Sequence, residues 1–177
     1  MELSNRETWA ALHGMVFGAL FLLAFGGGFA GLWSLRPEWI TANGLKERML
    51  RLKVGVTSMA VIAWITVITG TWIVYPWYRA TPPQGTTDFT EYPRSLLLST
   101  PGKEEWHSFG MEWKEHIAWA SPILATAVAF IVLYYGTQLI TDKKLRFLTM
   151  GLFVGAFAAA GIAGLLGAFI TKAAPVL

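Results

Sequence analysis

The sequence contains no cysteine, only three histidines and almost no charge within its long apolar segments. Without cysteine the chain can form no disulfide, no thiolate metal site and no iron–sulfur ligation, and it cannot attach a c-type haem through thioethers. The sequence also lacks a glycine-rich phosphate loop and a nucleophile elbow, which disfavours nucleotide and hydrolytic chemistry. The shortage of charge disfavours an ion pump or a secondary transporter, because such proteins need charged relays at membrane depth.

The main feature of the sequence is a set of long uncharged runs, and 54% of the 177 residues are hydrophobic. Each run has about 20 residues or more, which at 1.5 Å per residue spans a hydrocarbon core of about 30 Å. A surface helix of a soluble protein has one polar side, whereas helices formed by these runs would be apolar on every side. We therefore predict an all-α integral membrane protein, a four-helix up-down bundle that forms one domain over residues 1–177. The predicted spans are about 9–35, 54–75, 117–136 and 145–170, with a long loop at 76–115.

The charges of the connections predict the orientation. Basic residues outnumber acidic ones in the connections 36–53 and 142–146, whereas the long loop 76–115 is acidic. Because cytoplasmic loops carry an excess of Lys and Arg, both short connections are expected inside, and the long loop with both termini outside. The expected location is a bacterial-type inner (cytoplasmic) membrane. The net charge of +3 is then explained by the inner loops and requires no nucleic-acid partner.

The long outer loop is expected to contain a short interfacial helix. Thr100 followed by Pro101 has the pattern of an N-cap with proline at the first helical position. Glu104 and Glu105 would follow in the first turns, where the helix dipole favours acids. The helix is predicted to begin there and to run toward the third span. His107 has aromatic neighbours and is expected to face lipid headgroups or a partner.

The fourth span carries a ladder of small residues spaced four apart: Gly151, Gly155, Ala159, Ala163 and Gly167. Small residues let helix backbones approach closely in lipid, where no hydrophobic drive brings helices together. We expect this ladder to be the contact face of the helix, within the bundle or against another subunit. Phe153 is expected to face lipid.

Two of the three histidines carry the prediction of function. His13 and His116 each lie about one helical turn inside a tryptophan, Trp9 or Trp113, at the mouth of an apolar span. The first and third helices are diagonal in an up-down bundle, about 11–14 Å apart when neighbours are about 8–10 Å apart, so two imidazoles can reach one iron. We therefore expect a b-type haem near the outer face, with His13 and His116 as its metal ligands.

Other residues at the same depth are expected to complete the haem site. Arg6 and Lys114 would meet the propionates, and a carboxylate from Glu112 or Glu115 could orient His116 through its second ring nitrogen. Glycines would leave room for a flat, bulky group, and they occur at this depth on the first and fourth helices: Gly14, Gly18 and Gly164.

These features predict a membrane subunit of a respiratory or photosynthetic electron-transfer complex that passes electrons between a quinol and an outer-side partner. Such a chain is expected to relay electrons among other membrane subunits and not to act as an independent enzyme. A cofactor-free accessory subunit is an alternative, docking onto a catalytic neighbour through the fourth helix and the outer aromatic loop. A chlorophyll-binding subunit is another, in which each histidine ligates a separate magnesium. Quinone is a further candidate ligand.

Overall fold

The computed structural model describes residues 3–175, except for the side chains of residues 42 and 43, and it shows only helices and connections in this part of the chain. The described residues contain four helices that are long and apolar enough to cross a membrane: Asn5–Ser34, Gly44–Tyr78, Trp106–Tyr135 and Lys143–Ala173. The chain is therefore an all-helical, multi-pass membrane protein.

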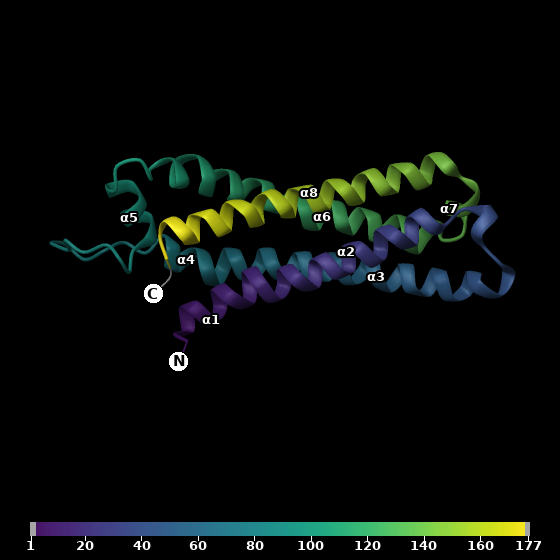
Figure 1. Cartoon of the computed structure of the whole chain (residues 1–177), viewed down its shortest axis with the longest axis horizontal. Helices are drawn as coiled ribbons and strands as arrows, with labels where there is room; N and C mark the ends of the chain where they lie inside the picture. Colours follow the sequence, from purple (N-terminus) through teal and green to yellow (C-terminus); the bar gives the residue numbers. More distant parts are fainter. Residues whose placement is uncertain (1–2, 176–177) are drawn as a thin grey trace.

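The long helices lie side by side along the long axis of the molecule (Figure 1). Helix α2 (Phe17–Ser34) packs against α3 (Ala42–Thr69), which in turn packs against α6 (Glu112–Tyr135). Helix α8 (Lys143–Ala173) packs against α6 and also contacts α2. Each long helix therefore has two neighbours.

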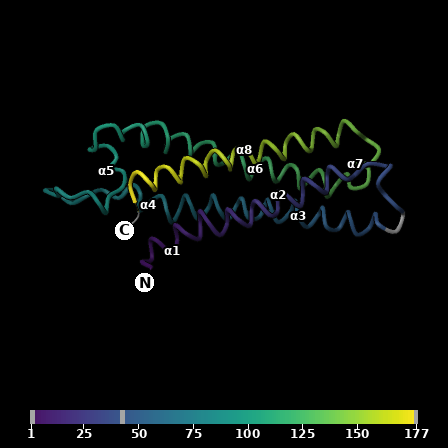
Figure 2. Tube along the Cα trace, viewed as in Figure 1, coloured from purple at the N-terminus to yellow at the C-terminus, as the bar shows by residue number. Residues whose placement is uncertain are grey.

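The two ends of the molecule differ in their connections (Figure 2). One end contains the two chain termini and the long connection of residues 79–105, and we call it the loop end. The other end contains the short connections, residues 35–41 and residues 136–142 with helix α7 (Gln138–Thr141), and we call it the turn end.

Local capping chemistry sets several helix boundaries. Ser4 and Glu7 form a capping box at the start of α1 (Asn5–Ala11). The Asp142 side chain accepts a hydrogen bond from a backbone N–H in the first turn of α8. At the end of α6, Gly136 has a φ of 50°, a backbone conformation that glycine adopts without steric cost. These caps satisfy backbone groups that have no partner within their helix.

Two helices extend well beyond the apolar runs that predicted them. Helix α3 begins at Ala42, and the third long helix begins at Trp106. The added turns of α3 are amphipathic, and Arg51 forms an ion pair with Glu47 one turn away on the exposed side. Most of the basic residues expected in the connection 36–53 therefore lie on a helix that continues past its apolar part, and Arg36 precedes it.

The predicted N-cap at Thr100 is wrong. A short helix, α5 (Pro93–Ser99), precedes this position, and Thr100 is its C-cap. The Thr100 hydroxyl donates to the Leu96 carbonyl at 2.6 Å, which satisfies a carbonyl at the end of α5. Proline does begin a helix in this connection, but the proline is Pro93.

The largest group of buried apolar residues lies at the turn end and in the middle of the bundle. Phe153 of α8 is fully buried there, and a Cβ on Gly28 of α2 would lie only 2.8 Å from its ring. The Phe25 ring lies 5.1 Å from the Phe153 ring, centroid to centroid. Gly28 also approaches α3, where a Cβ on Gly55 would lie 3.5 Å from the Gly28 backbone. Glycine thus permits the close approach of three helices.

The prediction that Phe153 faces lipid is wrong, and the ladder of small residues is only in part a contact face. Gly151 is exposed, whereas Ala159 and Ala163 are buried. A spacing of four residues advances about 40° beyond a full turn at each step, so a long ladder rotates away from any one neighbour. The buried face of α8 instead includes Phe153 and Ala156, which are spaced three apart.

Arg146 links the segments at the turn end through hydrogen bonds to their carbonyl groups. Its side chain is buried, and Nη1 donates to the carbonyls of Leu35 at 2.6 Å, Leu139 at 3.1 Å and Ile140 at 3.0 Å. Carbonyls at helix ends lack helical partners, and a guanidinium can satisfy several of them at once. Arg146 was counted only as a basic loop residue in the sequence, because one of its partners lies 111 positions away.

Large apolar side chains are exposed along the length of the bundle. Leu23 is 74% exposed, Leu165 62% and Phe130 59%. Such a surface would promote association in water, whereas lipid is a suitable solvent for it. Helical backbone hydrogen bonds are satisfied within each helix, as a spanning segment requires. The exposed surface therefore agrees with insertion in a membrane.

Candidate functional site

Irregular helical segments are concentrated at the loop end of the bundle. Three π-helical segments occur in the described residues, η1 (Leu12–Val16), η3 (Gly70–Val74) and η4 (Trp106–Met111). Each interrupts or extends a different long helix near the loop end, and α8 has no such segment within Lys143–Ala173. Segments of this kind are rare in proteins, and those that occur are often found at functional sites. Since η1 contains His13 and η4 contains His107, the loop end is the candidate functional region.

His13 lies between the first and second long helices. Its Nδ1 is 3.4 Å from the Thr69 hydroxyl oxygen. A Cβ on Gly70 would lie 2.6 Å from His13 Cε1, so the ring rests directly against the Gly70 backbone. Any larger residue at position 70 would displace the imidazole. The predicted ligand is therefore held by η3 in the present conformation.

His116 lies on α6, and its side chain is exposed. The buried side of α6 includes Ser121 and Ala125, and His116 is about 140° around the helix from Ser121. His116 Nδ1 is 2.6 Å from the carbonyl oxygen of Glu112. Because a carbonyl only accepts, Nδ1 must carry the proton, and Nε2 holds the lone pair. A backbone carbonyl thus orients His116, where a carboxylate was expected.

His13 and His116 lie in different surroundings. His13 rests against Gly70 on the second helix, whereas His116 is exposed on the third. Within residues 3–175, no group of three or more His, Cys, Asp or Glu side chains is placed to hold a metal ion. Rotation about a helix axis depends on tertiary packing, which the spacing of residues along one helix does not determine.

The predicted glycines do not line an enclosed slot. A Cβ on Gly14, Gly18 or Gly164 would meet no atom within 4 Å, so all three border open space. Gly167, one turn beyond Gly164 on α8, is different. A Cβ at this position would lie 3.0 Å from Cε of Lys114, so the lysine stem lies directly over Gly167.

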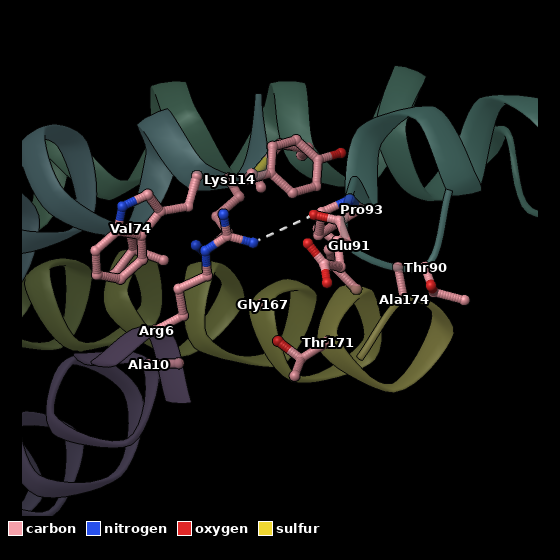
Figure 3. Close-up of a pocket in the computed structure, with 14 residues that line it drawn as sticks. Arg6, Ala10, Val74, Thr90, Glu91, Pro93, Lys114, Gly167, Thr171 and Ala174 are labelled. Carbon is pink, nitrogen blue, oxygen red and sulfur yellow. Dashed lines mark hydrogen bonds between the residues drawn. The ribbon is translucent and has the colours of Figure 1, made fainter. Parts of the chain in front are cut away.

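A cavity of about 70 Å³ opens at the loop end beside Lys114 (Figure 3). Its walls come from the start of α1, the end of η3 with α4 (Tyr75–Tyr78), residues 90–93, the end of η4 with the start of α6, and the end of α8. Arg6 and Lys114 both line it, so the two cations predicted to meet propionates share one cavity. Ligand pockets usually have volumes of about 300 Å³ or more, and this cavity is too small for a porphyrin.

A polar cluster of Tyr78, Arg94 and His107 lies next to this cavity, with Tyr78 and His107 buried and Arg94 partly exposed. His107 is only 6% exposed, which contradicts its expected position facing headgroups. Its Nδ1 is 2.9 Å from the Tyr78 hydroxyl oxygen, and Arg94 Nε donates to its Nε2 at 3.2 Å. Since Nε2 accepts, the neutral ring carries its proton on Nδ1, which donates to Tyr78. The cluster ties η4 to α4 and α5.

Sequence reasoning missed this cluster because its members come from three separate elements. The available signal was Arg94, a lone charge in the otherwise uncharged helix α5. Glu115 lies near this cluster and has a buried carboxylate oxygen, Oε1, without a hydrogen-bond partner among the described residues. The Glu115 carboxylate lies near the hydroxyls of Tyr75 and Tyr78. The loop end thus contains polar groups that the protein alone does not fully satisfy.

Comparisons with protein-family models, curated proteins and solved structures find no match to this chain. Its function is therefore inferred from the chemistry of the loop end.

Proposed function

We propose that this chain is a four-span, up-down subunit of an electron-transfer complex in a bacterial-type inner membrane. The loop end and both termini would face outside, and a b-type haem would bind near the loop end through His13 and His116. Electrons would pass between a quinol and an outer-side partner, with the haem supplying the one-electron chemistry. The protein would hold the imidazoles in the right tautomer and exclude water.

The ring of His116 is the observation that best supports the proposal. Its Nδ1–H is held by the Glu112 carbonyl at 2.6 Å, which leaves the Nε2 lone pair available at the exposed surface of α6. Histidines that ligate metals are commonly held in this way, with the second ring nitrogen donating to a carbonyl or a carboxylate. A porphyrin on His116 would lie against lipid or another subunit.

His13 offers a second imidazole ligand. Arg6 and Lys114 line a cavity at the same end, and two cations suit the two propionates of a haem. Because the cavity has a volume of only about 70 Å³, a macrocycle would require α1 to move away from α8. One iron shared by His13 and His116 requires such a movement, whereas two separate porphyrins require only one histidine each.

A reduced-minus-oxidised spectrum of the purified complex tests the haem. His116→Gly should abolish the low-spin b-type signal, and added imidazole should restore it, because free imidazole can replace the lost ligand. His13→Gly should behave in the same way if both rings share one iron. Ser108→Ala is the control, since Ser108 is exposed and donates only to the Glu104 carbonyl. A complex without haem assignable to this chain would end the proposal.

Two other functions have specific support. Exposed tryptophans near the loop end, Trp72 and Trp113, favour a cofactor-free accessory subunit that docks onto a catalytic neighbour. The different surroundings of His13 and His116 favour a chlorophyll-binding subunit, in which each magnesium needs one histidine. Pigment extraction from the same preparation distinguishes them, because chlorophyll, haem and the absence of both give different spectra.

The orientation can be tested with single cysteines, since the native chain contains none. Gln84 at the loop end and Lys144 at the turn end are both exposed. A membrane-impermeant thiol reagent added outside should label Gln84→Cys and spare Lys144→Cys. The opposite result would place the loop end in the cytoplasm, and labelling of both would contradict four spans.

A further inference from the structure

The cavity at the loop end contains more positive charge than its own residues neutralise. Arg6 and Lys114 line it, and Glu91 is the acidic residue in its wall. Lys103, at the edge of this region, is already used, because its Nζ donates to the Ala173 carbonyl at 2.8 Å. That bond also offsets the partial negative charge at the end of α8, which would otherwise repel an anion. The residues that line the cavity carry one excess positive charge, and the Glu115 carboxylate, which is not among them, lies close enough to interact with Lys114.

Lys114 is placed in the cavity by the shape of α8. Its stem passes over Gly167, where a Cβ would lie 3.0 Å from Lys114 Cε and 3.6 Å from its Nζ. Among the described residues, Lys114 has no hydrogen bond and no ion pair. Glu115, the next residue, attracts the ammonium electrostatically, but its buried Oε1 has no hydrogen-bond partner among the described residues. A half-buried ammonium without an acceptor is costly, so it favours an anion from outside the chain.

Arg6 faces the same space and is only weakly engaged. Its Nη1 donates to the backbone carbonyl of Glu91 at 3.4 Å, a long bond to a neutral acceptor (Figure 3). A guanidinium has five N–H donors and forms stronger bonds with carboxylate or phosphate oxygens. The hydroxyl of Thr171, on the α8 side of the cavity, adds another donor.

We propose that this cavity binds a phosphate group, with Lys114 and Arg6 as its charged ligands, and that an anionic phospholipid supplies it. A volume of about 70 Å³ holds a small tetrahedral anion and excludes rings of cofactor size. Trp77 in the cavity wall is typical of the membrane–water interface, where lipid phosphates lie. The acyl chains would remain in the bilayer. The inference needs no haem, although a propionate would compete for the same cations.

Native mass spectrometry of the full chain in detergent tests the site. Phosphatidylglycerol is expected to bind at least about tenfold more tightly than phosphatidylcholine, because the excess positive charge favours an anionic headgroup. Lys114→Gln and Arg6→Gln should each reduce phosphatidylglycerol binding by about tenfold. Lys172→Gln is the matched control, since Lys172 is an exposed cation near the same end of α8 and should have no effect.

A gain of binding separates the proposal from simple misfolding. Glu91→Gln removes the opposing carboxylate, so it should strengthen phosphatidylglycerol binding by several fold. Inorganic phosphate is the second probe, and Lys114-dependent binding of free phosphate at similar concentration would support the site while assigning it a soluble ligand. Unchanged lipid binding in the Lys114→Gln, Arg6→Gln double variant would overturn the proposal. None of these measurements depends on haem absorbance.

Discussion

The turn end and the loop end of the bundle are built in different ways. At the turn end, phenylalanine rings pack on glycine, the helices are regular, and the buried Arg146 has three carbonyl partners. The loop end contains three π-helical segments, a cavity with two cations and a buried carboxylate oxygen without a partner. Sites that bind ligands commonly retain such local conflicts, whereas regions that only stabilise a fold resolve them.

The largest expected effect is at the turn end. Phe153→Ala removes a fully buried ring that packs against Gly28 and Phe25, and we expect the free energy of unfolding to fall by about 3–5 kcal/mol. Phe147→Ala is the control on the same helix, and its exposed ring should cost under about 1 kcal/mol. Unfolding titrations in mixed micelles measure both. Similar losses for the two variants would contradict the assigned packing face of α8.

The second effect concerns the charge buried at the turn end. Arg146→Met keeps most of the side-chain volume but leaves the carbonyls of Leu35, Leu139 and Ile140 without their donor. We expect a loss of about 2–3 kcal/mol, because buried polar groups without partners are costly. Lys144→Met, two positions away and exposed, should change stability by under about 0.5 kcal/mol. Equal stability of the two variants would show that Arg146 does not link the segments at the turn end.

The sequence was sufficient where one property of a contiguous segment decides the outcome. Apolar length located the four long helices, since membrane thickness alone sets that length. It could not give rotation about each helix axis, and this is why Phe153 was placed toward lipid although it is fully buried. The ladder of small residues was misleading for the same reason, because a four-residue spacing does not stay on one face.

Partners distant in sequence were also beyond prediction. Arg146 meets a carbonyl 111 positions away, and His107 meets Tyr78 and Arg94 across 29 and 13 positions. Each residue type was visible, but only the tertiary arrangement shows which charge finds which acceptor. Arg6 and Lys114, which are far apart in sequence, line the same cavity.

The third effect tests the irregular helix at the loop end. Gly70→Ala introduces a methyl group where His13 Cε1 would lie 2.6 Å away, so the ring or η1 must shift. We expect a loss of about 1–2 kcal/mol, together with a changed environment of His13 in NMR spectra. Gly14→Ala, one residue beyond His13, meets open space and should leave stability unchanged or slightly higher, because alanine favours helix. An unperturbed His13 in the Gly70→Ala variant would contradict this contact.

The smallest effect distinguishes local from global stability at the loop end. Tyr78→Phe keeps the ring but removes the hydroxyl oxygen that accepts from His107 Nδ1 at 2.9 Å. One such hydrogen bond contributes about 1 kcal/mol, so amide protection in residues 93–111 should fall by about fivefold while the midpoint of global unfolding barely moves. Tyr134→Phe, exposed near the turn end, is the control and should leave exchange unchanged in both regions. A uniform loss of protection along the chain would show that the two ends unfold as one unit. Loss confined to the loop end would show that this region opens independently of the rest of the bundle.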